Sequence, residues 1–419
     1  MGYLRLLLEK LQNSVGKGGE KKGYEKNFDP DDPETIDMLC NLPAEKVWKI
    51  RKVSKGLCDL IQSPDFANTF LERAPSIAFL QRWQSMKFFY LDEDDNKRVL
   101  VNGSVPLLKK KKIPILVGSC NGLLLFESPP NFETKYNYYS YYIWNPVTQQ
   151  VVNFTCPALD SQSGRIYGLY YHSSTQEYRL LYLRMNTNDG LFVRDYGIIK
   201  AGQNAGRRLY LQGQQRIPCP KAQPPAVVVK NFLYWMADSD NSYYKRPCQH
   251  SIIGFDTDAE ELFTLPHPDD NICQPSTPHC PRIKYQMRLL EMDGRLTCWC
   301  LGVASAHVWV LNDESNNWSL RCHLNFDHDL FFKWLNHDIK LVSFLNNEVL
   351  LVWYDRVFRY NLSTRKVRNL KGFKHGFYLI LVAHTKSVVI LEDQRVGQPI
   401  YFESKEEDKS RWVDQVKQN

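Results

Sequence analysis

The stretch IWNPVTQQVV, residues 143–152, contains the pattern that decides the fold. An apolar pair precedes a polar turn and a second apolar pair follows it, which is typical of two antiparallel strands joined by a short connection. Asn, Asp and Ser suit such a turn because their side chains bond the backbone nearby. Similar arrangements recur at residues 170–178, 254–265, 310–320 and 359–370. This repetition predicts a protein built from similar β units.

A second hairpin pattern accompanies the first one. It is seen at residues 118–124 (GSCNGLL), 229–235 (VKNFLYW) and 292–296 (MDGRL). Asn-Gly and Asp-Gly are strong signals for a tight turn between strands. The two patterns together give four strands in each unit of about 40–55 residues, which is the signature of propeller blades.

Counting these units predicts a mainly β protein, a kelch-like β-propeller of about six blades that follows a small N-terminal α part. The blades are expected near residues 78–101, 113–154, 164–217, 224–265, 285–323 and 338–370. The strands that remain, near 377–402, are expected to complete the first blade and to close the ring without a covalent link.

Residues 31–73 have a helical period instead. Ile36, Leu39 and Cys40 share a helix face, and the Leu42-Pro43 pair ends that helix because proline disfavours a helical residue before it. Ser54 and Ser63 are expected to cap two further helices. The predicted organisation is a flexible leader at 1–29, a helical domain at 30–74, the propeller at 77–404 and a polar tail at 405–419.

Composition narrows the class of protein. The chain has 419 residues, of which 43% are hydrophobic, and no apolar run is long enough to span a bilayer, so no membrane association is expected. Eleven cysteines without a secretion signal predict reduced thiols in the cytoplasm, the nucleus or both. The net charge of +7 is partly local to residues 109–112, KKKK, which we interpret as a solvated loop rather than an import or anion-binding patch. No nucleic-acid partner is expected.

Catalytic and metal sites are weakly supported. The segment 118–122, GSCNG, superficially resembles a nucleophile elbow, but both of its flanks are strand-like. Cys298 and Cys300 alternate on a strand and therefore share a face, which is common for core thiols. Cys273, His279 and Cys280, with His267 nearby, lack the CxxC pair of a zinc site. We predict no enzyme, no cofactor and no metal.

Two regions are similar to a known family of plant proteins. Residues 38–55, MLCNLPAEKVWKIRKVSK, and 60–66, LIQSPDF, resemble an F-box as plants use it. Residues 113–370 resemble the F-box-associated domain that follows it. The matching pieces are GSCNGLL at 118–124, WNPVT at 144–148, FLYW at 232–235 and IIGFDT at 252–257.

The resemblance implies a substrate-recognition subunit of a cullin-type SCF ubiquitin ligase. Its F-box would dock on a Skp-type adaptor, and its propeller would bind an unknown target protein. The adaptor contacts carried over by position are Leu39, Leu42, Pro43, Val47, Ile50, Val53 and Leu60. The alternative for each of them is that it belongs to the core of the bundle.

The chain departs from the family pattern at three places. Pro33 and Glu34 stand in the first helix, and Leu57 replaces a tryptophan that is common after Val-Ser-Lys. A ligase-independent binding propeller therefore stays open as an alternative. A propeller enzyme or small-ligand sensor is a further one.

Tyrosines are the candidates for target contact, because they combine a large contact area with a polar tip. The predicted residues are Tyr136, Tyr138, Tyr139, Tyr243 and Tyr244. The alternative is that they pack their own hairpins. The identity of the target cannot be derived, since loops carry the specificity of propellers.

Overall fold

The computed structural model describes most of the chain between residues 32 and 391. The described ranges are 32–82, 88–91, 98–100, 114–128, 139–155, 164–188, 191–203, 206–209, 217–221, 225–238, 251–268, 287–301, 305–312, 315–325, 339–345, 348–353, 356–364, 366–370 and 379–391. The predicted leader at 1–29, the tail at 405–419 and the lysines at 109–112 lie outside these ranges.

Four helices form the N-terminal bundle within the described part of the chain: α2 (Pro33–Cys40), α3 (Ala44–Ile50), α4 (Lys55–Gln62) and α5 (Pro64–Arg73). The two predicted serine caps are confirmed. Ser54 Oγ accepts from Leu57 N at 3.2 Å, and Ser63 Oγ accepts from Phe66 N at 3.2 Å. The break at Leu42-Pro43 is confirmed as well, because α2 ends before it and α3 begins after it. None of these helices is long and apolar enough to cross a membrane.

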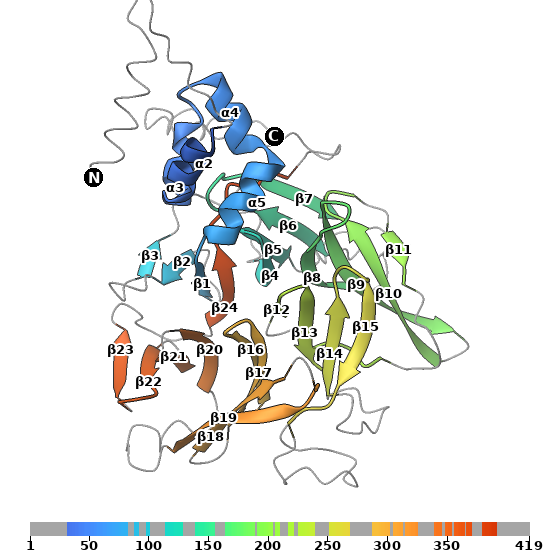
Figure 1. Cartoon of the computed structure of the whole chain (residues 1–419). Coiled ribbons are helices and arrows are strands. Elements are labelled where there is room, and N and C mark those ends of the chain that lie inside the picture. Colours follow the sequence, from blue (N-terminus) through green and yellow to red (C-terminus); the bar gives the residue numbers. More distant parts are fainter. Residues whose placement is uncertain are drawn as a thin grey trace, which may run out of the picture.

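The remaining described elements are strands. Figure 1 shows these strands in the lower part of the view, with the helical bundle α2–α5 above them. Their bounds are β1 (Ser76–Arg82), β2 (Phe88–Leu91), β3 (Arg98–Leu100), β4 (Ile115–Cys120), β5 (Leu123–Ser128), β6 (Ser140–Trp144), β7 (Val151–Thr155), β8 (Arg165–His172), β9 (Glu177–Asn188), β10 (Leu191–Lys200), β11 (Gly206–Arg208), β12 (Val227–Val229), β13 (Phe232–Met236), β14 (Ile252–Asp256), β15 (Glu261–Leu265), β16 (Met287–Met292), β17 (Arg295–Leu301), β18 (Ser305–Leu311), β19 (Trp318–Asn325), β20 (Ile339–Leu345), β21 (Glu348–Trp353), β22 (Arg356–Asn361), β23 (Val367–Leu370) and β24 (Leu379–Thr385).

The described strands pair into antiparallel four-stranded sheets, which are the blades of a propeller. Five sheets each consist of four consecutive strands: β4–β7, β8–β11, β12–β15, β16–β19 and β20–β23. The sixth sheet has the order β24-β1-β2-β3 and so combines strands from distant parts of the chain. A mainly β propeller behind a short helical region is therefore confirmed.

The pairing of β24 with β1 closes the ring, as the sequence predicted. The register runs from Ser76↔Thr385 to Arg82↔Leu379. The first strands of neighbouring blades contact each other, with β24 next to β4 and β20 next to β24. The expectation of strands as far as residue 402 is not met within the described residues, because β24 ends at Thr385 and residues 386–391 are neither helix nor strand.

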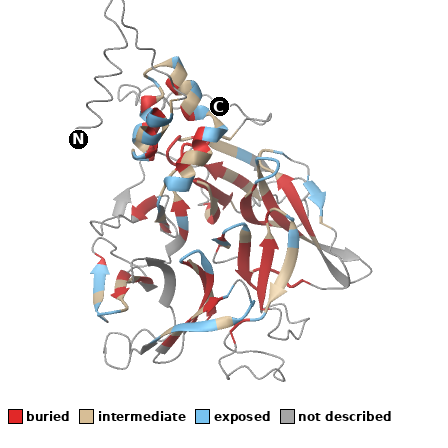
Figure 2. Cartoon of the chain, viewed as in Figure 1, coloured by how far each residue is buried: buried red, intermediate tan, exposed pale blue. Residues whose placement is uncertain are grey.

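Apolar clusters fill the spaces within and between the blades. Figure 2 shows buried residues along the middle of most sheets and exposed ones at the turns and outer strands. Phe79 of β1, for example, packs with Phe88, Trp144 and Val382, so one cluster joins β24 and β1–β2 to the blade β4–β7. Each blade therefore depends on its neighbours for a complete core.

The repeated polar turns join antiparallel neighbours as predicted. Four of them join the third strand of a blade to the fourth, whereas the turn at 173–176 joins β8 to β9, the first two strands of their blade. Asn145 Oδ1 accepts from Val147 N at 2.8 Å and from Thr148 N at 3.3 Å. Asp256 Oδ1 accepts from two backbone N–H groups at 2.9 Å, and Asn361 Oδ1 from two at 3.1 and 2.8 Å. The side chain that opens the turn thus supplies its acceptor in three blades.

Candidate functional site

The seven residues expected to contact an adaptor divide into two groups. Leu39, Val47 and Ile50 are buried in the bundle core, together with Leu57 and Ile61. Their side chains pack inside the bundle, and this burial favours the core alternative for these three residues.

The other four residues lie closer to the surface. Pro43 is exposed, while Leu42, Val53 and Leu60 are partly buried and pack against the edge of the same core. Leu42 and Pro43 stand at the turn before α3, Val53 at the turn before α4, and Leu60 near the end of α4. Adaptor contact therefore stays a prediction for these four residues.

Exposed lysines alternate along the sequence with the residues of this apolar edge, and the contact set predicted from the sequence did not include them. Lys46, Lys49, Lys52 and Lys55 are all exposed. Arg51 instead lies over the ring of Trp48, with its guanidinium carbon 4.0 Å from the ring centroid. The signal is visible in the sequence as a lysine at every third position. A small apolar surface with a basic border suits a partner whose surface is acidic.

The propeller has two different faces, because successive connections in an antiparallel sheet alternate between its ends. Connections from a blade's first to second strand and from its third to fourth strand are short, as at 121–122, 145–150, 230–231 and 293–294. Longer connections leave from the opposite ends, as at 129–139, 209–226, 237–251 and 266–286. The bundle lies on the short-turn face, since Val147 of the 145–150 turn belongs to the bundle's apolar cluster.

Both groups of candidate tyrosines fall in connections that start and end at the long-connection face. Tyr139 immediately precedes β6 and is partly buried, with its ring centroid 6.5 Å from that of Tyr141. The Arg165 guanidinium lies 5.1 Å from the Tyr139 ring. Tyr139 therefore has a packing role at the edge of its hairpin. Tyr136, Tyr138, Tyr243 and Tyr244 lie outside the described residues, and their contact with a target stays a prediction.

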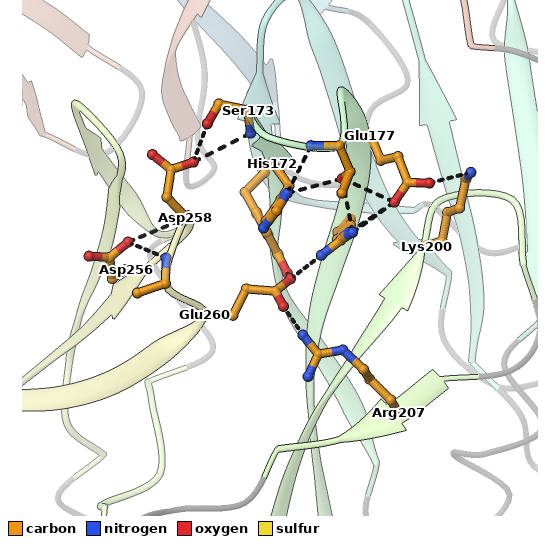
Figure 3. A network of polar contacts seen from close by, with 12 residues as sticks. His172, Ser173, Glu177, Lys200, Arg207, Asp256, Asp258 and Glu260 are labelled. Atoms are coloured by element: carbon orange, nitrogen blue, oxygen red, sulfur yellow. Dashed lines mark hydrogen bonds and ion pairs between the residues drawn. The ribbon is translucent and has the colours of Figure 1, made fainter.

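A network of charged side chains joins the blades β8–β11 and β12–β15 on the short-turn face (Figure 3). Glu260 Oε1 accepts from Tyr170 Oη at 2.7 Å and from Arg179 Nη1 at 2.6 Å, and Glu260 also pairs with Arg207. Asp258 accepts from Ser173 Oγ at 2.7 Å and from Asn231 Nδ2 at 2.6 Å. These carboxylates are satisfied, so the network acts as a clamp between blades rather than as a reactive centre.

The same network lowers the pKa of two acids, Glu177 and Asp258. Glu177 accepts from Lys200 Nζ at 2.7 Å and from Arg179 Nη2 at 2.8 Å, and these bonds lower its pKa to about 2. The hydrogen bond from Ser173 lowers the pKa of Asp258 as well. Carboxylates held ionised by cations and donors are poor general acids or bases near neutral pH.

Candidate nucleophiles are deactivated by their surroundings. Cys120 ends β4 next to a tight turn, with φ of 48° at Asn121 and 82° at Gly122, as expected for a blade hairpin. Burial raises the pKa of the Cys120 thiol to about 12. The Cys298 and Cys300 sulfurs lie 3.9 Å apart in the core, which confirms that they share a face. The contact with Cys300 and burial also raise the pKa of Cys298, so the Cys120 and Cys298 thiols are protonated at neutral pH and unreactive.

One Ser–His contact escaped the sequence reasoning. Ser119 Oγ lies 3.1 Å from His384 Nδ1, although the two residues are distant in the sequence. Burial lowers the pKa of His384 to about 3, and no described residue bonds its Nε2. A catalytic triad needs a third group on that nitrogen. Among the described residues, no group of three or more His, Cys, Asp or Glu side chains is placed to hold a metal ion.

Comparison with known proteins gives a family match over most of the chain. Residues 76–385 match a family described as the F-box associated beta propeller domain. An F-box protein of Arabidopsis thaliana is 24% identical over 315 residues, which cover 71% of this chain and 70% of that protein. A putative F-box protein of the same plant is 22% identical over 291 residues, 67% of each chain.

Solved structures resemble the chain only distantly. The β-propeller domain of the Trilobed protease from Pyrococcus furiosus is 11% identical with a TM-score of 0.35, over 74% of this chain and 80% of that one. Pyrococcus horikoshii acylaminoacyl peptidase is 8% identical with a TM-score of 0.33, over 64% of this chain and 40% of that one. Likeness at this level carries no conclusion about activity.

Proposed function

This chain belongs to the plant F-box proteins with an F-box-associated β-propeller, and we propose that it is the substrate-recognition subunit of a cullin-type SCF ubiquitin ligase. The bundle of α2–α5 docks on a Skp-type adaptor and, through it, on a cullin. The propeller binds a target protein for ubiquitination, in the cytoplasm or the nucleus.

The observation that carries this proposal is the arrangement of the two faces. The bundle packs on the short-turn face, and the longer connections leave from the other one. A receptor that presents its target to a ligase needs its adaptor site and its target site free at the same time. This architecture meets that need, and it favours the long-connection face for the target.

The proposal describes a binding protein rather than an enzyme. The family suggests a non-enzymatic adaptor role. The chemistry of the described residues agrees with it, because the Ser119–His384 pair lacks a third group and the thiols of Cys120 and Cys298 have raised pKa values. A propeller enzyme would require a cluster of unsatisfied ionisable groups instead.

A ligase-independent binding propeller is the second candidate, because the F-box departs from its family pattern. Pro33 stands at the first position of α2, where proline is tolerated, and Glu34 is an exposed acid in the first turn. Leu57 is 1% exposed and fills the core. None of the three departures removes a residue of the apolar edge around Pro43, and this supports docking.

The test is binding of the full chain to a plant Skp-type adaptor in a purified system. We expect Leu42→Asp to weaken adaptor binding roughly tenfold or more by placing a charge at the apolar edge. The double variant Lys46→Glu, Lys49→Glu is expected to weaken it by a similar factor, with a loss of salt dependence.

The matched control is Lys230→Glu, Lys366→Glu, which reverses two exposed lysines of the blade turns. It is expected to bind the adaptor as the wild-type chain does. A well-folded wild-type chain that fails to bind adaptors of this class would contradict the ligase proposal and favour the ligase-independent one.

A further inference from the structure

Residues 386–391, which follow β24, run between the bundle and the propeller and are called the strap here. The apolar side chains of the strap alternate between the two bodies, as they would in an extended segment. Val388 and Ile390 pack in the bundle's cluster, whereas Val389 and Leu391 pack in the cluster of the blades β4–β7 and β8–β11. The strap is therefore an apolar segment that packs on the bundle with one side and on the blades with the other.

Asn145 holds the strap in place. Its Nδ2 donates to the Ser387 carbonyl at 3.1 Å and to the Val389 carbonyl at 2.8 Å, and the Asn145 side chain is buried. Its Oδ1 caps the 145–150 turn at the same time. One amide thus joins a blade turn to the strap, and this turn carries Val147 into the bundle's cluster.

Further contacts fix the beginning of the strap. Ser387 Oγ donates to the Asn121 carbonyl at 2.7 Å, next to Gly122. Lys386 Nζ lies 2.7 Å from Glu45 Oε1 of α3 and 4.4 Å from the centroid of the Tyr90 ring. The strap is therefore bonded to the bundle on one side and to two blades on the other.

The bundle depends on side chains of the strap for a complete apolar core. A domain of about 40 residues is marginal when it folds alone. Val388 is 1% exposed and belongs to the same cluster as Leu39, Val47 and Phe66. We propose that the strap is a structural part of the F-box, so that the bundle reaches its docking structure only when the strap is seated. The consequence for adaptor binding rests on the proposed function, whereas the structural part does not.

The other blades supply a matched control for Asn145. Asp256 and Asn361 cap their own turns in the same way. Since Asp256 shows that an aspartate caps this turn, Asn145→Asp keeps the acceptor and removes the two donors to the strap. Asn361→Asp makes the same chemical change in a turn that is remote from the strap.

The experiment is amide hydrogen exchange on the full-length chain. We expect Asn145→Asp to raise the exchange rates of α2, α3 and α4 roughly tenfold or more, because two carbonyls of the strap lose their donor. Asn361→Asp is expected to leave those rates unchanged. Equal protection of the helices in both variants would overturn the proposal.

A second pair of variants covers the outcome in which Asn145→Asp fails to fold. Val388→Ala and Val349→Ala each remove two methyl groups from a valine that is 1% exposed, one in the strap and one in β21. Val388→Ala is expected to raise exchange in the bundle roughly tenfold. Val349→Ala is expected to act on the blades β16–β19 and β20–β23, whose shared cluster contains Val349, and to leave the bundle unchanged. Unchanged exchange in the bundle of Val388→Ala would show an autonomous F-box.

Adaptor binding is measured on the same four proteins, with a purified Skp-type adaptor as the probe. Weaker binding by Val388→Ala, but not by Val349→Ala, is the expected result. If the wild-type chain does not bind, the proposed function fails, but the exchange data still decide the role of the strap. If Val388→Ala binds normally although its helices exchange faster, docking reorders the bundle, and the strap is not required for docking.

Discussion

At the scale of single residues, Glu177 shows how strongly a single carboxylate can be held by charged neighbours within one blade. Its carboxylate accepts from Thr175, Arg179 and Lys200, and the side chain is mostly shielded from solvent. Because these partners favour the ionised form, its pKa falls from 4.5 to about 2. The folded state therefore binds fewer protons than the unfolded state in this range.

This shift predicts a specific loss of stability in acid. A depressed folded pKa contributes stability that is fully present above about pH 4.5 and is lost as the pH falls towards about 2. We expect Glu177→Gln to lower the melting temperature at pH 7 and to reduce its fall between those two values. Glu72→Gln, an exposed acid of α5, is the control. If the melting temperatures of the wild-type chain and of Glu177→Gln fall by the same amount over this pH range, the lowered pKa of Glu177 is contradicted.

The sequence predicted residue roles that depend on the next few residues, but it did not separate core residues of the bundle from surface ones. The caps at Ser54 and Ser63 need only the next three residues, and both are confirmed. Leu39, Val47 and Ile50 were expected at a docking surface, yet they are buried. Helical spacing shows that residues share a face, but it does not show what covers that face.

At the scale of elements, the blade hairpins are similar in sequence and different in surroundings. Gly122 and Gly294 both have positive φ, at 82° and 72°, in turns that join the first two strands of a blade. A Cβ at Gly122 would clash with Ser387 and with the Thr385 carbonyl, whereas nothing lies within 4 Å of a Cβ at Gly294. One turn is therefore restricted by the strap, and the other one only by its own backbone.

These two glycines allow the two effects to be separated. Gly294→Ala is expected to cost about 1 kcal/mol of unfolding free energy, which is the penalty of a left-handed alanine. Gly122→Ala adds a steric clash and is expected to cost about 2–4 kcal/mol. Urea denaturation of both variants checks the order. Equal costs would mean that the strap moves aside freely.

Strands were predicted more successfully than the strap. Alternating apolar residues and Asn-Gly or Asn-x-x-Thr turns repeat from blade to blade, so each copy supports the others. Residues 386–391 have no copy, and they were assigned to the closing strands. Their fold is set by the bundle, by Asn145 and by the Asn121 carbonyl, none of which is near them in the sequence.

At the scale of the whole molecule, the ring is closed by the sheet β24-β1-β2-β3. Phe79 of β1 lies at the centre of this closure. Its ring centroid is 5.6 Å from that of Phe88 and 5.5 Å from that of His384 of β24. The stability of the ring therefore depends on packing between strands that are almost 300 residues apart.

Removing this side chain is expected to loosen the closure first. Phe79→Ala creates a cavity that costs about 3–5 kcal/mol, and we expect faster amide exchange in β24 and β1 than in β16–β19. Phe358→Ala removes an equally buried ring from the blade β20–β23 and serves as the control. If β24 and β1 of Phe79→Ala exchange more slowly than β16–β19, the closing sheet is not the part of the ring that opens first.

The fold of the whole molecule was predictable, and its target was not. Repetition reveals blades, and the resemblance to an F-box reveals the bundle. The sequences of the longer connections differ from blade to blade, so one connection does not help to predict the structure of another. The contacts of the clamp at Glu260 come from residues about 80 positions away, as with Arg179, and no spacing rule predicts such pairs.

The non-covalent closure also sets the order of events during translation. A ribosome adds about 5–20 residues per second, so β1 waits roughly 15–60 s for β24 to be made. During that interval the nascent ring has an open edge, and strand edges of this kind attract other chains or chaperones. The strap is synthesised after β24, so the bundle's core is completed last. If the strap has the role proposed above, the bundle cannot reach its final structure before the last propeller strand has been made.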